Sequence, residues 1–220
     1  MTVLRSANLW FFLILSLNFW FVPLLPQAVA AEVFTDDLLT VTLLAAVAFQ
    51  GIARADFRLW AILAAAVILA ARLIEEVFPN VGYVENATYA VCFATVAALY
   101  FHTMTKMLSE VTFDTVLAAA CAYIPIGMVF TFLFSLIVEF DAGAIQAPSE
   151  MVASSDLLFY SFATITTLGT SEFVPVSQLA RMLTVFEAVI GLIYMAILVG
   201  AVVGSFSARL ASKQAETRDR

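Results

Sequence analysis

Long apolar runs recur along nearly the whole 220-residue chain, and they restrict its fold more than any other feature of the sequence. Six of them approach or exceed the roughly 20 residues that a helix needs to cross a bilayer. They cover Asn8 to Ala30, Leu38 to Ala53, Leu59 to Phe78, Ala87 to Thr105, Val116 to Val138 and Val176 to Phe206. The runs are continuous and lack the alternation of a membrane β-barrel, so we predict an all-α protein with six transmembrane helices.

The composition supports a bilayer environment. Hydrophobic residues make up 63% of the chain, charged residues 12%, and the mean hydropathy is +1.01. A soluble globular domain has about 25% charged residues. A water-soluble fold could not bury this much apolar surface, so we expect membrane lipid to surround the protein.

The charge of the chain and the positions of its cysteines limit what it can bind. The net charge is −7, and the scattered Lys and Arg residues form no basic surface of the kind that binds nucleic acid. Cys92 and Cys121 both lie inside apolar runs, where a free cysteine packs as a small hydrophobic residue. We therefore expect no nucleic-acid partner, no disulfide and no metal centre built on cysteine.

The placement of positive charge predicts the topology. Short cytoplasmic loops carry an excess of Lys and Arg. With the N-terminus inside, the cytoplasmic side receives Arg5, Arg54, Arg58, Lys106, Arg209, Lys213, Arg218 and Arg220. This predicts a multi-pass protein of a plasma membrane, such as a bacterial inner membrane, with both termini cytoplasmic. The alternative for Met1 to Ala30 is a cleaved secretory signal, because Ala28-Val29-Ala30 resembles a cleavage site.

The segment from Ser155 to Thr166 is apolar but too short to cross a bilayer. It begins at the capping residues Ser155 and Asp156 and ends in threonines, and a glycine, a proline and a full-length span follow. This order predicts a re-entrant half-helix and loop. Non-helical backbone at membrane depth is tolerated only where it is buried in protein or lines a water-filled path, so the loop implies a conduit.

This stretch resembles the pore module of potassium channels, in which a short pore helix leads into a filter of the form T-V-G-Y-G-D. The matching residues are Thr167, Leu168, Gly169, Thr170, Ser171 and Glu172. The resemblance implies a homotetramer in which backbone carbonyls replace the hydration shell of an ion. It places monovalent cations, K⁺ and possibly Na⁺, at Thr167, Leu168, Gly169 and Thr170, with Ser171 ending the filter and Glu172 at its outer mouth.

The filter departs from the family pattern at three positions. Thr170 stands in place of the aromatic residue, Ser171 in place of the second glycine, and Glu172 in place of the aspartate. Glycine holds a positive φ at no steric cost, whereas serine pays about 1 kcal/mol or more. We therefore expect the outer filter to relax and potassium discrimination to weaken.

The last span carries two further candidates. By the resemblance, Gly191 would be a hinge of the inner helix, while Gly200 and Gly204 would favour close helix packing. Glu187 is a carboxylate within the span, which is costly unless it is paired or hydrated. It could face the cavity and attract cations, or face the pore helix and accept a hydrogen bond from a Thr or Tyr hydroxyl. We favour the second arrangement.

Outside the membrane, four carboxylates would form an acidic vestibule that concentrates cations, once repeated in four copies. They are Glu139, Asp141, Glu150 and Glu172.

Four regions follow from these features. Residues 1–106 form an N-terminal four-helix transmembrane region, 107–115 a cytoplasmic linker, 116–206 the pore domain, and 207–220 a short cytoplasmic tail. The sequence shows no metal-binding pair, Ser/His arrangement or inverted repeat, so we predict neither an enzyme nor a cofactor. The expected function is passive cation conduction. The alternative is a non-conducting relative with a collapsed filter and a structural or regulatory role.

Overall fold

The structure is a computed structural model, and it describes residues 62, 66, 70, 82–107, 113–148 and 152–218. In this part of the chain the order of elements is α5, α6, β1, α7, β2 and α8. The spans predicted over Asn8 to Ala30, Leu38 to Ala53 and, apart from isolated residues, Leu59 to Phe78 lie outside the described residues. The described part is mostly helical, and the total of six spans stays a prediction.

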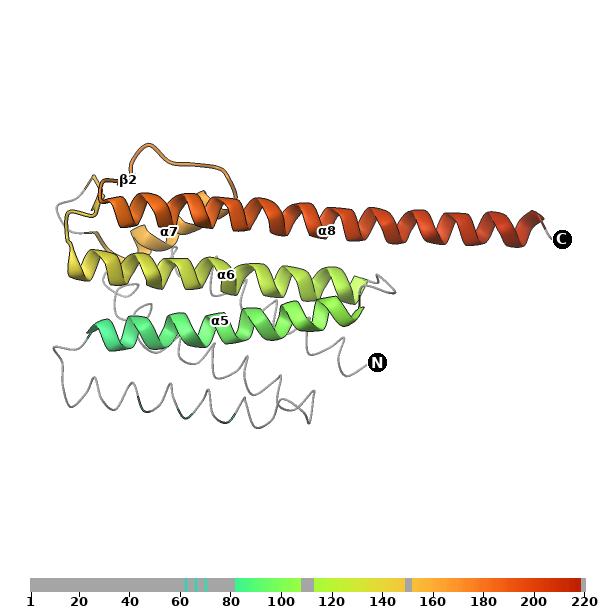
Figure 1. The fold of residues 1–220 in the computed structure, drawn as a ribbon, viewed down its shortest axis with the longest axis horizontal. Helices are drawn as coiled ribbons and strands as arrows, with labels where there is room; N and C mark the ends of the chain where they lie inside the picture. The colour runs from blue at the N-terminus through green and yellow to red at the C-terminus, as the bar shows by residue number, and fades with distance from the viewer. Residues whose placement is uncertain are drawn as a thin grey trace, which may run out of the picture.

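Helices α5 (Gly82–Met107) and α6 (Phe113–Phe140) run side by side (Figure 1). Both cover the apolar runs that predicted them and extend a few residues beyond each end. Helix α5 begins before the apolar run that starts at Ala87, and Gly82 to Asn86 form its first turn.

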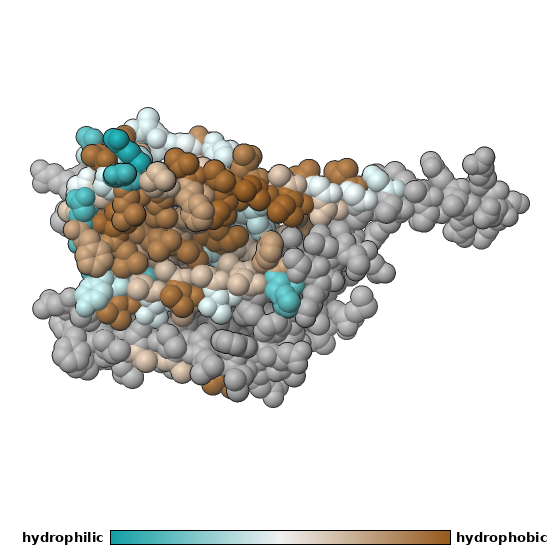
Figure 2. Space-filling view, in the orientation of Figure 1, coloured by the Kyte–Doolittle hydropathy of each residue, from teal (hydrophilic) through white to brown (hydrophobic). Residues whose placement is uncertain are grey.

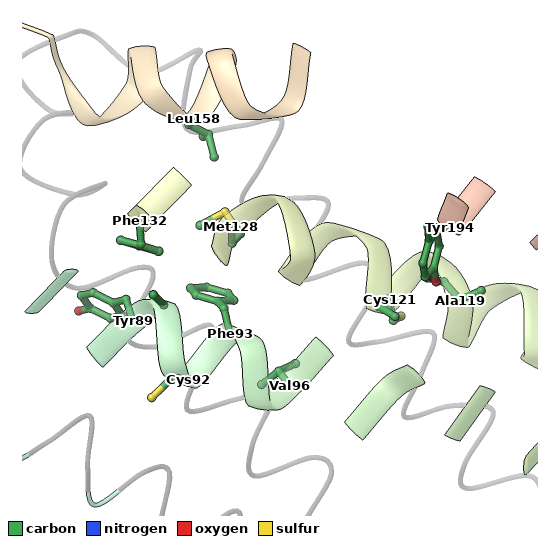
Figure 3. Packing of buried hydrophobic residues seen from close by; sticks show 12 residues of the cluster. Tyr89, Cys92, Phe93, Val96, Ala119, Cys121, Met128, Phe132, Leu158 and Tyr194 are labelled. Atoms are coloured by element: carbon green, nitrogen blue, oxygen red, sulfur yellow. The ribbon is translucent and has the colours of Figure 1, made fainter. Parts of the chain in front are cut away.

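Aromatic stacking holds α5 against α6. The ring of Phe132 lies 5.1 Å from that of Tyr89 and 5.7 Å from that of Phe93, both in stacked geometry. Figure 3 shows Phe132 above these two rings, with Met128 beside it and Leu158 reaching in from α7. All of these side chains are buried, so this cluster fixes how α5 packs on α6 and α7.

The predicted re-entrant half-helix is α7 (Ser154–Ile165), whose 12 residues rise about 18 Å, too short to cross a bilayer. Its start lies one residue before the predicted one. Asp156 stabilises it, because its carboxylate accepts a hydrogen bond from the Ala153 N–H at 3.0 Å. From the end of α7 the chain returns in a long loop to β2 and the start of α8 (Figure 1).

One small sheet was not predicted. Strand β1 (Ile145–Gln146) pairs antiparallel with β2 (Val174–Pro175), so Ile145 lies opposite Pro175. The Val176 N–H also donates to Ala144 O at 2.8 Å. These hydrogen bonds connect the segment that follows the loop to the segment that follows α6.

Helix α8 (Gln178–Arg218) is the longest element and extends well past α5 and α6 (Figure 1). Within the described residues, two segments are long and apolar enough to cross a membrane, Ala119–Phe140 in α6 and Gln178–Gly204 in α8. Helical structure continues beyond residue 206, through the region expected to be a short tail. Figure 2 shows hydrophobic side chains covering α6 and the first half of α8, with hydrophilic ones at the loop end.

The aromatic cluster gives a first test of this packing. We expect Phe132→Ala to destabilise the protein toward the lower end of the roughly 3–5 kcal/mol typical of Phe-to-Ala changes in packed cores, since lipid tails are as apolar as the cluster itself. Thermal unfolding in detergent measures the effect. Val91→Ala, on an exposed face of α5, is the matched control and should change little. Equal effects of the two changes would contradict the packing described here.

Candidate functional site: a loop held between α6, α7 and α8

The loop after α7 has an unusual backbone. Thr167 has a φ of 59° and Gly169 a φ of 71°, and among the described residues Thr167 is the only non-glycine with a positive φ. A β-branched residue is strained in this conformation, by about 1–3 kcal/mol. Such strain persists only where the surroundings impose it, and it is concentrated at functional sites.

Hydrogen bonds impose this shape on the first half of the loop. The Thr167 N–H donates to Thr164 O and the Gly169 N–H to Ala163 O, both at 2.9 Å. The two N–H groups therefore turn back toward α7. None of the hydrogen bonds in the described part of the chain ends on a carbonyl of Thr167, Leu168, Gly169 or Thr170. Leu168 is 75% exposed, and its neighbours Thr167 and Gly169 are also exposed.

The second half of the loop is built differently. Ser171 takes the place where a glycine was expected by resemblance, and it does not adopt a positive φ. Instead the Thr170 hydroxyl accepts a hydrogen bond from the Glu172 N–H at 3.1 Å. The alternation of positive and negative φ thus ends at Gly169. After it, the chain forms a turn that is stabilised by the Thr170 hydroxyl.

Helix α7 is fixed to α8 through two pairs of polar side chains. The Tyr160 hydroxyl lies 2.6 Å from the Thr184 hydroxyl. Since Thr184 already donates its one proton to Ala180 O at 2.8 Å, Tyr160 is the donor of this pair. Tyr160 is buried, and its ring packs edge-on against that of Phe134 in α6 at 4.9 Å. A single side chain therefore joins all three helices behind the loop.

The second pair is Ser161 and Glu187. Glu187 is fully buried, and its Oε1 lies 2.5 Å from the hydroxyl of Ser161 on α7. The same hydroxyl lies 2.8 Å from Gly127 O on α6. Of the two orientations predicted from the sequence, the carboxyl thus faces α7, the helix expected to be the pore helix, but its partner is a serine rather than a threonine or tyrosine. Its second oxygen, Oε2, has no hydrogen-bond partner among the described residues.

The glycines of α8 differ in their surroundings. Gly191 lies directly against Ile165, the last residue of α7, and the helix runs through it without a break. Gly200 and Gly204 have no described atom within 4 Å of the position of a Cβ, so they make no close packing contact within this part of the chain. Close helix packing by these two glycines stays a prediction.

The acidic residues predicted for the outer mouth lie near the ends of elements. Glu139 is exposed at the end of α6 and accepts a hydrogen bond from the Asn86 amide at 3.2 Å. Asp141 is exposed just beyond it and accepts one from the Gly143 N–H. Glu172 is exposed on the loop, while Glu150 lies outside the described residues.

Three residues that position α7, the helix before the loop, were not predicted from the sequence: Tyr123, Gly127 and Ser161. Tyr123 donates its hydroxyl proton to Ile165 O at 2.9 Å. Gly127 leaves space for the ring of Phe162, which would lie 2.7 Å from a Cβ at that position. The available signals were a glycine inside an apolar run and a serine near the middle of a short apolar helix, and both are too common to identify a contact.

Comparison with known proteins identifies part of this arrangement. Residues 126–207, which include the second half of α6, all of α7, the loop and most of α8, match the sequence model of a family described as "Ion channel". This confirms the resemblance inferred from the loop and its flanking spans. Neither the curated proteins nor the solved structures contain a significant match to the chain.

The Ser161–Glu187 pair gives a second prediction. We expect Ser161→Ala to destabilise the protein by about 1–3 kcal/mol, because it leaves a buried carboxyl without its partner. Replacing both residues, in Ser161→Ala/Glu187→Leu, should recover much of this loss, since removing both members of a buried polar pair is often close to neutral.

Thermal or denaturant unfolding in detergent measures both variants. Thr95→Ala is the matched control, because its hydroxyl bonds only to Val91 O within its own helix. A double variant less stable than Ser161→Ala alone would show that the pair does not hold the two helices together.

Proposed function

We propose that this protein is a homotetrameric cation channel of the potassium-channel type with weakened selectivity, because residues 126–207 match the model of an ion-channel family. Monovalent cations, K⁺ and to a lesser degree Na⁺, would pass down their gradients through a path lined by Thr167, Leu168, Gly169 and Thr170. The proposal includes no enzymatic step and no resident cofactor.

The observation that carries the proposal is the positive φ at both Thr167 and Gly169, with Leu168 between them. When φ alternates in sign along a chain, successive N–H groups gather on one side and the carbonyls turn to the other. Here the N–H groups of residues 167 and 169 bond to α7, which leaves the carbonyls free to face away from it. Rings of such carbonyls can replace the hydration shell of a cation.

A fourfold assembly is proposed because one chain provides only one such loop. A single loop leaves its carbonyls open on one side, whereas closed rotational symmetry would place copies around a common axis. The first half of α8 has a row of large exposed apolar residues. These are Leu179, Met182, Val185, Phe186, Val189, Leu192 and Ile193. Neighbouring copies and lipid would cover them.

Weakened selectivity is proposed from the outer half of the loop. Ser171 lacks the positive φ that would continue the alternation, so the carbonyls of Thr170 and Ser171 are not held in the same way as those before them. The short Thr170 side chain also provides no ring to pack the outer wall. Discrimination between K⁺ and Na⁺ depends on the number and geometry of coordinating carbonyls, so fewer well-placed carbonyls should reduce it.

Cation flux into liposomes tests the proposal directly. We expect purified protein to pass K⁺ and, several-fold more slowly, Na⁺, but not a large organic cation such as N-methyl-D-glucamine. Chemical cross-linking of the same sample should give a tetramer. Potassium flux without sodium flux would contradict weakened selectivity, and a tetramer without any flux would favour a non-conducting structural or regulatory protein.

The two departures in the outer filter give a separate prediction. We expect Thr170→Tyr/Ser171→Gly to raise the K⁺-to-Na⁺ flux ratio by roughly tenfold, since it restores a residue that tolerates positive φ and a ring that packs the wall. Val176→Ala, an exposed change beyond the loop, is a control for general perturbation. An unchanged ratio would show that these two positions are not the cause of any loss of selectivity.

A further inference from the structure

The contact between Gly191 and the end of α7 leaves no room for a side chain. A Cβ at position 191 would lie 2.2 Å from Ile165 O, 2.8 Å from Ile165 Cγ1 and 3.0 Å from Ile165 C. The nearest atom belongs to the backbone, so it cannot rotate aside as the tip of a side chain would. Ile165 is also buried, and it ends α7 only two residues before Thr167.

The same carbonyl is held from the opposite helix. The Tyr123 hydroxyl, on α6, donates to Ile165 O at 2.9 Å. The Tyr123 ring in turn packs against the ring of Tyr194 on α8, with centroids 5.3 Å apart, and the Tyr194 hydroxyl donates to Ala119 O. The Ile165 carbonyl, the last of α7, therefore lies between the Tyr123 hydroxyl of α6 and Gly191 of α8.

We propose that Gly191 is a positioning residue, which seats the end of α7 against α8 and so places the start of the filter at Thr167. Its smallness is what matters in this role, rather than an ability to bend. Two observations separate the two roles. Helix α8 is unbroken at Gly191. Of the three glycines of α8, only Gly191 has a described atom of another element within 4 Å of the position of a Cβ, because Gly200 and Gly204 have none.

The effect on the filter rests on the proposed conduction, but the contact itself does not. The Thr167 N–H donates to Thr164 O, one residue before the clamped Ile165. A displacement of Ile165 would therefore be passed to the strained residue that begins the candidate ion path.

Gly191→Ala tests the proposal, with Gly200→Ala as its matched control. Both changes add one methyl group within the same helix, and both raise intrinsic helix propensity. We expect Gly191→Ala to lower the melting temperature in detergent by about 4 °C or more, and Gly200→Ala to leave it unchanged or raise it. We also expect the K⁺-to-Na⁺ flux ratio to change by roughly threefold or more in Gly191→Ala alone.

A hinge predicts the opposite result. A stiffer helix would raise the melting temperature in both variants, and it would alter how often the pore opens without altering the ion ratio. That outcome would overturn the proposal. If wild-type protein passes no ions, the proposed conduction is wrong. The melting temperatures of Gly191→Ala and Gly200→Ala still test whether Gly191 positions the end of α7 against α8.

Tyr123→Phe provides a second test that adds no atoms. It releases Ile165 O on the α6 side, so we expect a smaller change of the flux ratio in the single variant. In Tyr123→Phe/Gly191→Ala the freed carbonyl can move away from the new methyl group, so the fall in melting temperature should be less than the sum of the single falls.

Additive losses would show that the two residues do not act on one carbonyl and would overturn the proposal. If Gly191→Ala fails to assemble while Gly200→Ala assembles, Tyr123→Phe decides. A flux ratio and melting temperature equal to those of the wild type would then overturn the proposal, and a change in the ratio would support it.

Discussion

A bilayer provides no hydrogen-bond partners for backbone, and the rest of this structure depends on that constraint. A helix meets it alone, but the loop after α7 cannot. Its N–H groups at residues 167 and 169 are satisfied by carbonyls of α7, whose own last carbonyl is capped by Tyr123. Beyond the loop, pairing of β2 with β1 takes over this role. Hydrogen bonds to α7 thus hold the start of the non-helical segment, and pairing with β1 holds its end.

Polar contacts are important for holding α7 in place. Apolar contacts between helices stabilise it less, because lipid tails can cover the same apolar surface equally well. Tyr160 and Ser161 are neighbours on α7, and each reaches a polar side chain of α8. Ser161 also lies within hydrogen-bond distance of α6. A buried carboxyl such as Glu187 is costly without partners, so its presence makes sense only where the helix is held in one orientation. These contacts fix the rotation of α7, which apolar packing alone would leave looser.

Much of this arrangement could be predicted from local sequence. Apolar runs predicted α6 and α8, and a short capped helix followed by threonines, a glycine and a proline predicted α7 and its loop. The partner of Glu187 could not be predicted, because it depends on how α7 and α8 cross. The same holds for the approach of Ile165 to Gly191, and for the pairing of β1 with β2, which joins residues about thirty positions apart. The polar residues 207–220 predict a short tail, and residues 207–218 of it continue helix α8.

The strain at Thr167 connects the support of the loop to the proposed selectivity. A threonine at a φ of 59° would relax if its surroundings allowed, so the shape of the inner loop is a property of α6, α7 and α8 together. On a looser support, the backbone at Thr167 would not keep this positive φ. At Ser171 the support ends, and the backbone returns to an unstrained conformation with a threonine-centred turn. The boundary between a firmly held inner half and a relaxed outer half therefore lies just beyond Gly169, and this is where a loss of potassium preference would originate.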